Sequence, residues 1–390
     1  MTSVGSRLGV GARPEGGGVD FDRLRADRRR RVFDAMAAAD LDALVLGRPA
    51  NVAFVSGARQ LWTAGARPFG PTCVVVAGTA RVHLLSVWDE GVPPEIEHAD
   101  LYGLSWNPAN LLRSLSGISG LQAARRVGTD GLSPGFPQFL AAAAPSAEIV
   151  DATTALRSVR DVKSADEIAC IATAAAIAES ALATMMSALR PGVSERELVA
   201  RYVEHISRLG APTPPSEAAV SVTPRRGRVD PPGVASSRTA AGGDLVVLDP
   251  GAMYAGYEAG MGRTSLVPGG HQRSRQAELL ERARRQLAAV VASCRPGATG
   301  ADVRAAWADA GGTLAPMPIV HGLGLGAEAP VVTSMLGSDE VLRAGMVVSA
   351  QVWVTEEGIG GCLERDTVLV DDGGPVALTR SARDSAMSSS

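Results

Sequence analysis

Three polar side chains in the C-terminal half of the chain could carry acid–base chemistry. Asp249 follows a short apolar run, His321 stands among glycines in the segment HGLGLG, and Glu364 lies in the segment LERD. A carboxylate beside a neutral imidazole orients the ring and makes it more basic, as general-base catalysis requires. We therefore predict that Asp249 and His321 form an acid–base pair, and that Glu364 binds a cationic group or acts as a base.

Each of these residues also has a structural interpretation. Asp249 opens the sequence Asp-Pro-Gly, which is typical of a turn, and His321 could be a satisfied structural histidine, although the glycines around it leave it unshielded by packing. Glu364 and Arg365 are neighbours in a strand-like segment, where side chains alternate between faces. Only one of the two therefore faces inward unless a bulge intervenes, and the sequence leaves open which one.

An internal repeat indicates how these residues are positioned. The segment RPGVSEREL (190–198) resembles RPGATGADV (295–303), and each copy follows a long helical pattern and opens another helix through a capping sequence. The glycine-led strands 243–249 and 345–351 repeat at a similar offset, which places Asp249 and Gln351 at matching positions. Unless the two RPG turns are alike by chance, this pattern predicts an α+β domain with a pseudo-twofold repeat and a cavity between its halves.

The first part of the chain alternates helical and strand-like patterns. A helix is predicted from Phe21, and further segments follow in the order strand 42–47, strand 72–78, strand 82–88, helix 108–116 and helix 136–144. This order predicts an α/β N-terminal domain over residues 19–155, followed by the α+β domain over 156–380. Residues 1–18 and 381–390 are predicted to be disordered tails.

Composition narrows the possible functions. The 390 residues are 46% hydrophobic with a net charge of −3, which excludes wholesale disorder and argues against a nucleic-acid surface. We interpret the arginine run at 28–31 as a solvated helix face. The four cysteines are widely spaced and predicted to be reduced and buried. Without a signal sequence or a stretch of eighteen apolar residues, we expect a soluble cytoplasmic protein that does not contact membranes.

Several phrases of the second domain resemble the pita-bread superfamily, which includes methionine aminopeptidase, Xaa-Pro aminopeptidase, prolidase and creatinase. They are GDLVVLDPGAMYAGYEAGMGRTSLV (243–267), HGLGLGAEAP (321–330), GMVVSAQV (345–352) and GGCLERDTVLV (360–370). The resemblance covers about residues 20–380, because the N-terminal domain fits the creatinase/prolidase type. It implies the pita-bread fold for residues 156–380 and a homodimer.

The metallopeptidase members of that superfamily hold two divalent metal ions with five side chains. Carried over by position, Asp249 and His321 match, whereas the other three ligands fall on Gly260, Gln351 and Arg365. Two divalent cations would then face one carboxylate and an added positive charge, and hard cations need oxygen ligands that glycine and arginine lack. The catalytic histidines of the peptidases are also replaced. We therefore predict no metal and no other cofactor.

The creatinase branch works without metal, and we interpret the motif register as closest to that branch. Its last motif resembles Leu363-Glu364-Arg365-Asp366, and its N-terminal domain carries an Arg-Pro pair that matches Arg67-Pro68. Its base histidine maps to Pro232, however, so creatine is a poor candidate substrate. The residues predicted to contact substrate are Arg67, Tyr257, Arg263, Gln351 and Arg365, with a fold-keeping ion pair as the alternative role of Arg263.

These observations favour a metal-independent enzyme that acts on a small amino-acid-like or guanidino-like substrate. Hydrolysis of a C–N bond is the first prediction and a lyase or cyclisation step is the second, in a biosynthetic setting. The alternatives are a catalytically dead, peptidase-like binding or scaffold protein, an atypical Xaa-Pro peptidase, and a single-metal enzyme using Asp249, His321 and Glu364. The predicted partners are a small-molecule substrate and a second copy of the chain, without nucleic acid.

Overall fold

The structure, a computed structural model, divides into two compact units. It describes residues 18–58, 73–85, 91–103, 107–132, 135–211, 214–216, 219–224, 229–269, 274–335 and 339–379. Along the chain, the division between the two units falls between Arg160 and Asp161. The predicted boundary near residue 155 therefore falls inside a helix, α5 (Thr153–Asp161), and the division comes at the end of that helix instead. The predicted tails lie outside the described residues, apart from Gly18.

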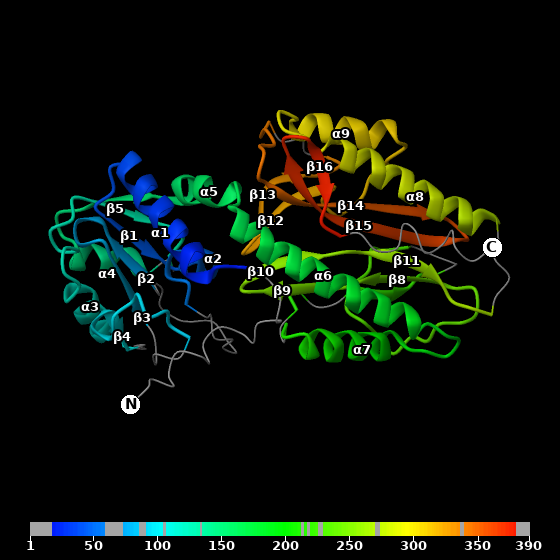
Figure 1. The fold of residues 1–390 in the computed structure, drawn as a ribbon, viewed down its shortest axis with the longest axis horizontal. Coiled ribbons are helices and arrows are strands. Elements are labelled where there is room, and N and C mark those ends of the chain that lie inside the picture. The colour runs from blue at the N-terminus through cyan, green and yellow to red at the C-terminus, as the bar shows by residue number, and fades with distance from the viewer. Residues whose placement is uncertain are drawn as a thin grey trace. The chain divides into compact units, whose positions relative to one another are not determined.

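The first unit is built on a six-stranded mixed sheet, with strand order β4-β3-β2-β1-β5-β6 (Figure 1). Its strands are β1 (Ala43–Leu46), β2 (Cys73–Val76), β3 (Arg81–Leu85), β4 (Leu101–Tyr102), β5 (Arg126–Thr129) and β6 (Glu148–Asp151). Strand β1 pairs antiparallel with β2 and parallel with β5, and all four of its side chains are buried. Three of these strands are the ones predicted from apolar runs, while β4, β5 and β6 were not predicted. The end of the predicted strand 82–88 lies outside the described residues.

Five α-helices belong to the described part of this unit, and three of them lie at positions that the sequence predicts. They are α1 (Phe21–Ala38), α2 (Pro49–Ser56), α3 (Pro108–Ser116), α4 (Phe136–Ala143) and α5, with short 3₁₀ turns η1 (Ala77–Thr79) and η2 (His98–Asp100). Asp20 and Asn107 cap α1 and α3 by accepting backbone N–H groups of the first turn, and proline opens α2 and α3. Only α2 and α5 were not predicted as separate helices.

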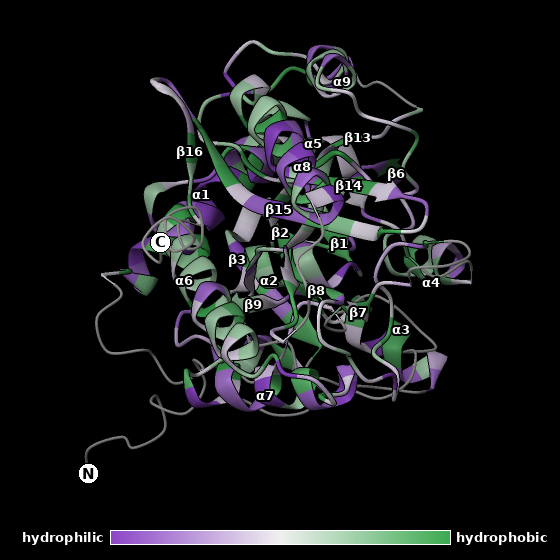
Figure 2. Ribbon diagram, turned by 90° about the vertical axis from the view of Figure 1, so that its right-hand side faces the viewer, coloured by the Kyte–Doolittle hydropathy of each residue, from purple (hydrophilic) through white to green (hydrophobic). Residues whose placement is uncertain are grey.

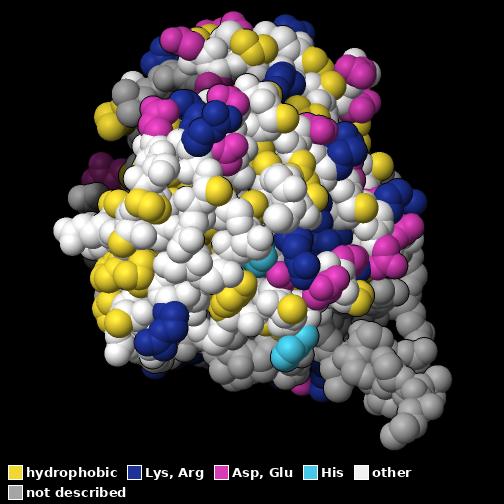
Figure 3. Space-filling view, turned by 90° about the vertical axis from the view of Figure 1, so that its left-hand side faces the viewer, with side chains coloured by type: hydrophobic (Ala, Val, Ile, Leu, Met, Phe, Trp, Pro, Cys, Tyr) yellow, Lys and Arg dark blue, Asp and Glu magenta, His cyan; other side chains and the backbone are white. Residues whose placement is uncertain are grey.

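The arginine run on α1 differs from the predicted solvated face. Arg28 is 4% exposed, and its guanidinium lies 5.6 Å from the centre of the Phe54 ring. Arg30 and Arg31 form ion pairs with Asp27. Figure 3 shows basic and acidic side chains intermixed on the face that it draws. Long arginine stems cover apolar surface while their charged heads find acidic partners, which the run of letters alone does not reveal.

The second unit shows the predicted repeat in its backbone geometry. Gly192 and Gly297 have left-handed φ angles of 86° and 85°. The Gly192 N–H donates to the carbonyl of Ala240, and the Gly297 N–H donates to the carbonyl of Leu342. Each glycine precedes a capping box, centred on Ser194 in one half and on Thr299 in the other. The pseudo-twofold α+β domain is therefore confirmed.

Two helices and a group of strands form each half of this unit. The helices are α6 (Ala165–Ser187) and α7 (Glu195–Arg208) in the first half, and α8 (Ser274–Ser293) and α9 (Gly300–Asp309) in the second. The strands of the first half are β7 (Ala219–Val222), β8 (Leu245–Asp249), β9 (Gly251–Tyr254), β10 (Tyr257–Gly260) and β11 (Arg263–Leu266). Those of the second half are β12 (Val320–Gly324), β13 (Gly326–Val332), β14 (Val347–Glu356), β15 (Gly360–Asp371) and β16 (Gly374–Ala377). Each half buries its own apolar core beneath its own helix pair.

Helix α6 is the most apolar helix of the unit and begins at a capping box formed by Ser164 and Glu167. It is long and apolar enough to cross a membrane by length and composition, and half of its most apolar window is buried in the unit. Its buried side chains share one core cluster with α7 and the strands of the first half. Figure 2 shows hydrophilic residues on α7, which has polar and apolar sides. We interpret α6 as the core helix of this half.

Candidate active site

A cavity of about 380 Å³ opens in the second unit among strands of both halves. Its walls come from the segment 214–216 and from β10, β12, β13, β14 and β15. The lining residues that carry polar or shaping roles are Glu258, Gly260, His321, Leu323, Ser349 and Arg365. The size is at the lower end of small-molecule sites. The predicted cavity between the halves is thus present.

Strand register decides between Glu364 and Arg365. Arg365 lies opposite Gln351 across the β14–β15 pair, and its side chain lines the cavity. Glu364 projects to the other face of β15, like Cys362, which packs in the core under α8. There Glu364 is 4% exposed and lies 3.5 Å from Arg263 Nε. The prediction that Glu364 acts in the site is therefore corrected: no bulge brings it to the cavity.

Asp249 pairs with Arg365 and not with His321. The Oδ1 atom of Asp249, at the end of β8, lies 2.8 Å from Arg365 Nη2. That nitrogen also lies 3.4 Å from the carbonyl oxygen of Pro250. A Cβ atom at Gly260 would overlap Nη2. The guanidinium therefore occupies the space that a side chain at position 260 would need, and the two residues are matched in shape.

His321, on β12, is held neutral by its surroundings. Burial lowers the pKa of His321 to about 4, and the positive charge of Arg365 acts in the same direction. Its Nδ1 atom is buried without a hydrogen-bond partner in the described part of the chain. The predicted activation of His321 by Asp249 is thus corrected, because the Asp249 carboxylate is engaged by Arg365. Burial raises the pKa of Asp249, and Arg365 and Arg263 oppose that rise.

Glu258 is the cavity residue that the sequence analysis missed. It lies on β10 two residues before Gly260, so strand alternation places both on the same face. Burial raises the pKa of Glu258 to about 7; the Arg365 charge opposes this rise and the Glu328 carboxylate adds to it. A carboxyl that titrates near neutrality is suited to general-base catalysis. Side chains two residues apart in a strand share a face, so counting back two positions from Gly260 would have identified Glu258.

Two residues predicted to bind substrate have other partners. The Tyr257 hydroxyl donates to Glu167 Oε1 at 2.5 Å, on the face of β10 opposite Glu258, and the ring is 1% exposed. The Gln351 side-chain amide donates to the carbonyl oxygen of Pro318 at 2.8 Å. Neither side chain lines the cavity. The structure therefore does not bring Tyr257 and Gln351 to the cavity with the other predicted site residues.

Arg263 also has a structural role in the interior. It is 7% exposed, and its Nη2 atom lies 2.6 Å from Asp366 Oδ1. Its Nη1 atom donates to the carbonyl oxygen of Arg365 at 2.7 Å. This is the fold-keeping ion pair that the sequence analysis held as the alternative, and Arg263 does not line the cavity. Arg67, the remaining predicted substrate contact, lies outside the described residues.

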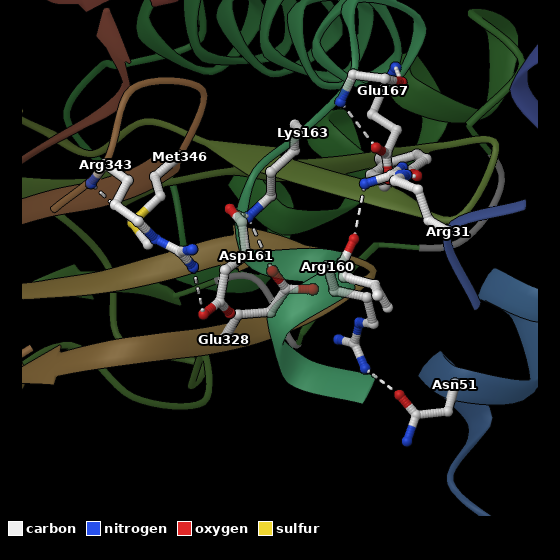
Figure 4. Close-up of polar contacts among 12 residues, drawn as sticks. Arg31, Asn51, Arg160, Asp161, Lys163, Glu167, Glu328, Arg343 and Met346 are labelled. Carbon is white, nitrogen blue, oxygen red and sulfur yellow. Dashed lines mark hydrogen bonds and ion pairs between the residues drawn. The ribbon is translucent and has the colours of Figure 1, made fainter. Parts of the chain in front are cut away.

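Glu328, on β13, has a fixed partner. The Nζ atom of Lys163, the one lysine of the chain, lies 2.8 Å from Glu328 Oε2 (Figure 4). The two side chains are 2% and 6% exposed, and Lys163 Nζ also donates to the carbonyl oxygen of Asp161. Glu328 is therefore held in a buried ion pair, and its negative charge acts on Glu258 from beyond the cavity wall.

The side chains present do not fit the two-metal centre of the metallopeptidases. Arg365 fills the space beside Gly260 with a positive charge, and Asp249 is paired with that charge. The Gln351 amide is turned to a backbone carbonyl. Within the described ranges, no group of three or more His, Cys, Asp or Glu side chains is arranged to hold a metal ion.

Divalent metal ions are therefore expected to leave the stability of this protein unchanged. A ligand that binds only the native state raises the melting temperature by mass action. We expect no shift when Mn²⁺, Co²⁺ or Zn²⁺ is added to the purified chain, and none when EDTA is added. Differential scanning fluorimetry measures both. A saturable rise with one of these ions, reversed by EDTA, would contradict the charge argument.

Comparisons with known proteins agree with the two-unit architecture. Residues 169–372 match metallopeptidase family M24, and residues 28–162 match the creatinase/prolidase N-terminal domain. The Xaa-Pro dipeptidase of Pyrococcus horikoshii is 27% identical over 366 residues, covering 92% of this chain and 98% of that protein. The Xaa-Pro dipeptidase of Pyrococcus furiosus is 25% identical over 366 residues, covering 92% and 99%. The predicted pita-bread fold with its N-terminal α/β domain is confirmed.

A solved structure extends this likeness to three dimensions and corrects one prediction. The crystal structure of the prolidase from Pyrococcus horikoshii OT3 has a TM-score of 0.75 and 26% identity, covering 92% of this chain and 99% of that one. These relatives are Xaa-Pro dipeptidases and a prolidase, not creatinases. The interpretation that the chain lies nearest the creatinase branch is therefore wrong, although the coarser resemblance to the superfamily holds.

Proposed function

This chain belongs to metallopeptidase family M24, and from that premise we propose that it hydrolyses the peptide C–N bond of a small Xaa-Pro-type substrate without a divalent metal ion. The relatives named above are Xaa-Pro dipeptidases, which supports the substrate class. One observation carries the chemistry: Glu258, His321 and Arg365 converge on a single cavity. In it the carboxyl of Glu258 has a pKa of about 7 and the imidazole of His321 a pKa of about 4.

Glu258 acts as the general base in this proposal. Its carboxylate accepts a proton from a water molecule while the water oxygen bonds to the carbonyl carbon of the substrate. Glu258 then returns that proton to the leaving nitrogen as the C–N bond breaks, which yields a carboxylic acid and an amine. His321 is neutral at physiological pH. In this proposal its ring N–H donates a hydrogen bond to the bound substrate, and the ring does not itself gain a proton.

The cavity favours a peptide over a guanidino compound. Arg365 presents a positive charge to the cavity, so a cationic guanidino substrate would meet repulsion there. The apolar part of the lining comes from Pro215, Leu323 and Ala327, which suits a proline ring or a small apolar side chain. The atypical Xaa-Pro peptidase thus replaces the guanidino-like reading as the proposed function.

The pH dependence of hydrolysis tests the assignment of the base. Glu258 must be ionised to accept a proton, so kcat/KM for a dipeptide such as Ala-Pro is expected to rise with pH through about 7 and then level off. His321 stays neutral above pH 4 and adds no further inflection in the neutral range. Steady-state assays from pH 4.5 to 9 measure the profile, with and without EDTA.

Two results would count against the proposal. A rate that rises only near pH 4, or that depends on added metal, would contradict Glu258 as base. Absence of turnover across a panel of Xaa-Pro dipeptides would refute the hydrolase and favour the binding or scaffold alternative.

A further inference from the structure

Arg365 is the one cationic side chain among the described residues that line the cavity. Its guanidinium is fixed on one side: Nη2 contacts Asp249 Oδ1 and the Pro250 carbonyl oxygen, and Gly260 leaves the space that it fills. The side chain is 19% exposed. A guanidinium stays protonated at every physiological pH, so this cavity carries a permanent cation in a fixed position.

Two nitrogens of the same guanidinium lack acceptors. Nε is buried without a hydrogen-bond partner, and no described residue accepts a hydrogen bond from Nη1. Buried polar groups are almost always satisfied, and an unsatisfied one in a native structure calls for an explanation such as a ligand. Asp249 contacts Nη2, and neither Glu258 nor His321, the other titratable side chains among the described residues that line the cavity, accepts a hydrogen bond from Nε.

We propose that Arg365 is a built-in cation that binds the negatively charged oxygen formed when water adds to the scissile carbonyl. This inference rests on the proposed function, since it assigns the group that stabilises the oxyanion in that reaction. A fixed cation aimed at developing charge in a water-poor site is an effective source of catalysis. Arg365 is thus a catalytic residue, and Asp249 and Gly260 are positioning residues that hold its guanidinium.

The test uses a phosphinic isostere of an Xaa-Pro dipeptide, which carries a negative oxygen on a tetrahedral centre. Binding to the full-length chain is measured by isothermal titration calorimetry at pH 8. We expect Arg365→Met to weaken binding by about 100-fold, the scale seen when one oxyanion-binding donor is removed. Arg365→Lys should bind weakly too, because a lysine lacks the planar fork.

Two glycine variants test whether binding needs the Arg365 guanidinium in its exact position or only its presence in the cavity. Gly260→Ala keeps Arg365 but displaces it, because the added Cβ overlaps Nη2, so we expect weaker binding of the isostere. Gly233→Ala is the matched control: Gly233 is exposed and an added Cβ meets no atom within 4 Å. Binding by that variant should equal wild type. Circular dichroism checks the fold of each variant.

The isostere also has a C-terminal carboxylate, which a guanidinium could bind instead. Its C-terminal amide removes that group and keeps the phosphinate. An Arg365 effect that persists with the amide supports the proposal, and an effect seen only with the free carboxylate overturns it. Equal binding by wild type and Arg365→Met, or no binding by wild type, also overturns it.

Two further results keep this inference separate from the proposed function. Should the Arg365 variants not fold, a crystal structure of the wild-type complex decides, because the phosphinate oxygen must lie within hydrogen-bond distance of Arg365. Binding that depends on Arg365 without hydrolysis of any Xaa-Pro dipeptide would refute the hydrolase and with it the catalytic role of Arg365, whereas hydrolysis without Arg365-dependent binding would overturn this inference alone.

Discussion

Glu258→Gln is expected to lower kcat for Xaa-Pro hydrolysis by about 10²- to 10⁴-fold, the range that general acid–base catalysis contributes. Glutamine keeps the shape of the side chain but cannot accept a proton from water. The substrate contacts of Arg365 and the apolar wall remain, so KM should change far less than kcat. Steady-state kinetics at pH 8, where most Glu258 is ionised in the wild type, measures the loss.

Glu364→Gln is the matched control for this prediction. Burial raises the pKa of Glu364 to about 7, as it does for Glu258, but Glu364 projects away from the cavity on β15. A raised pKa alone therefore does not distinguish the two carboxyls, whereas their placement does. We expect Glu364→Gln to keep near wild-type kcat. Near wild-type activity in Glu258→Gln, or an equal loss in Glu364→Gln, would contradict the assignment.

The repeat in the second unit was predictable because its signals are local. A left-handed turn at Gly192 and Gly297, followed by a capping box, is specified by a few adjacent residues. The same holds for the capping box at Ser164, which marks the start of α6. Strands β5 (RVGT) and β6 (EIVD) were missed because they carry few apolar residues, and tertiary pairing of β5 with β1 and of β6 with β5 defines them more than their own composition does.

The site was only half predictable because its key contacts join residues far apart in the chain. Asp249 and His321 were identified by motif. The partner of Asp249, at the end of β8, is Arg365 on β15, more than a hundred residues further along the chain. Gly260 leaves open the space that the Arg365 guanidinium fills, so the two positions fit each other in volume. In the sequence, Gly260 and Arg365 appear only as two positions without a metal ligand. In the structure, they form one feature, a guanidinium seated beside a glycine in the cavity wall.

The second large effect concerns stability. Arg263→Met is expected to lower the free energy of unfolding of the second unit by about 3–5 kcal/mol, the range for breaking one half of a buried ion pair. Asp366 is 0% exposed and receives hydrogen bonds from Arg263 Nη2 at 2.6 Å and from Thr379 Oγ1 at 3.0 Å. Without Arg263 its carboxylate stays buried and loses this cationic partner. Urea unfolding followed by tryptophan fluorescence measures the change.

Two variants show whether the buried charge causes this loss. Arg208→Met removes an ion pair with Glu204 whose side chains are 76% and 52% exposed, so no measurable change is expected. The double variant Arg263→Met, Asp366→Asn removes the buried charge along with its partner, so it should be more stable than Arg263→Met alone. Equal or greater destabilisation in the double variant would mean that Arg263 acts mainly through its other contacts, the carbonyls of Gly262 and Arg365 and the carboxylate of Glu364. In that case the strand crossing beside the cavity, and not the charge of Asp366, would be what Arg263 maintains.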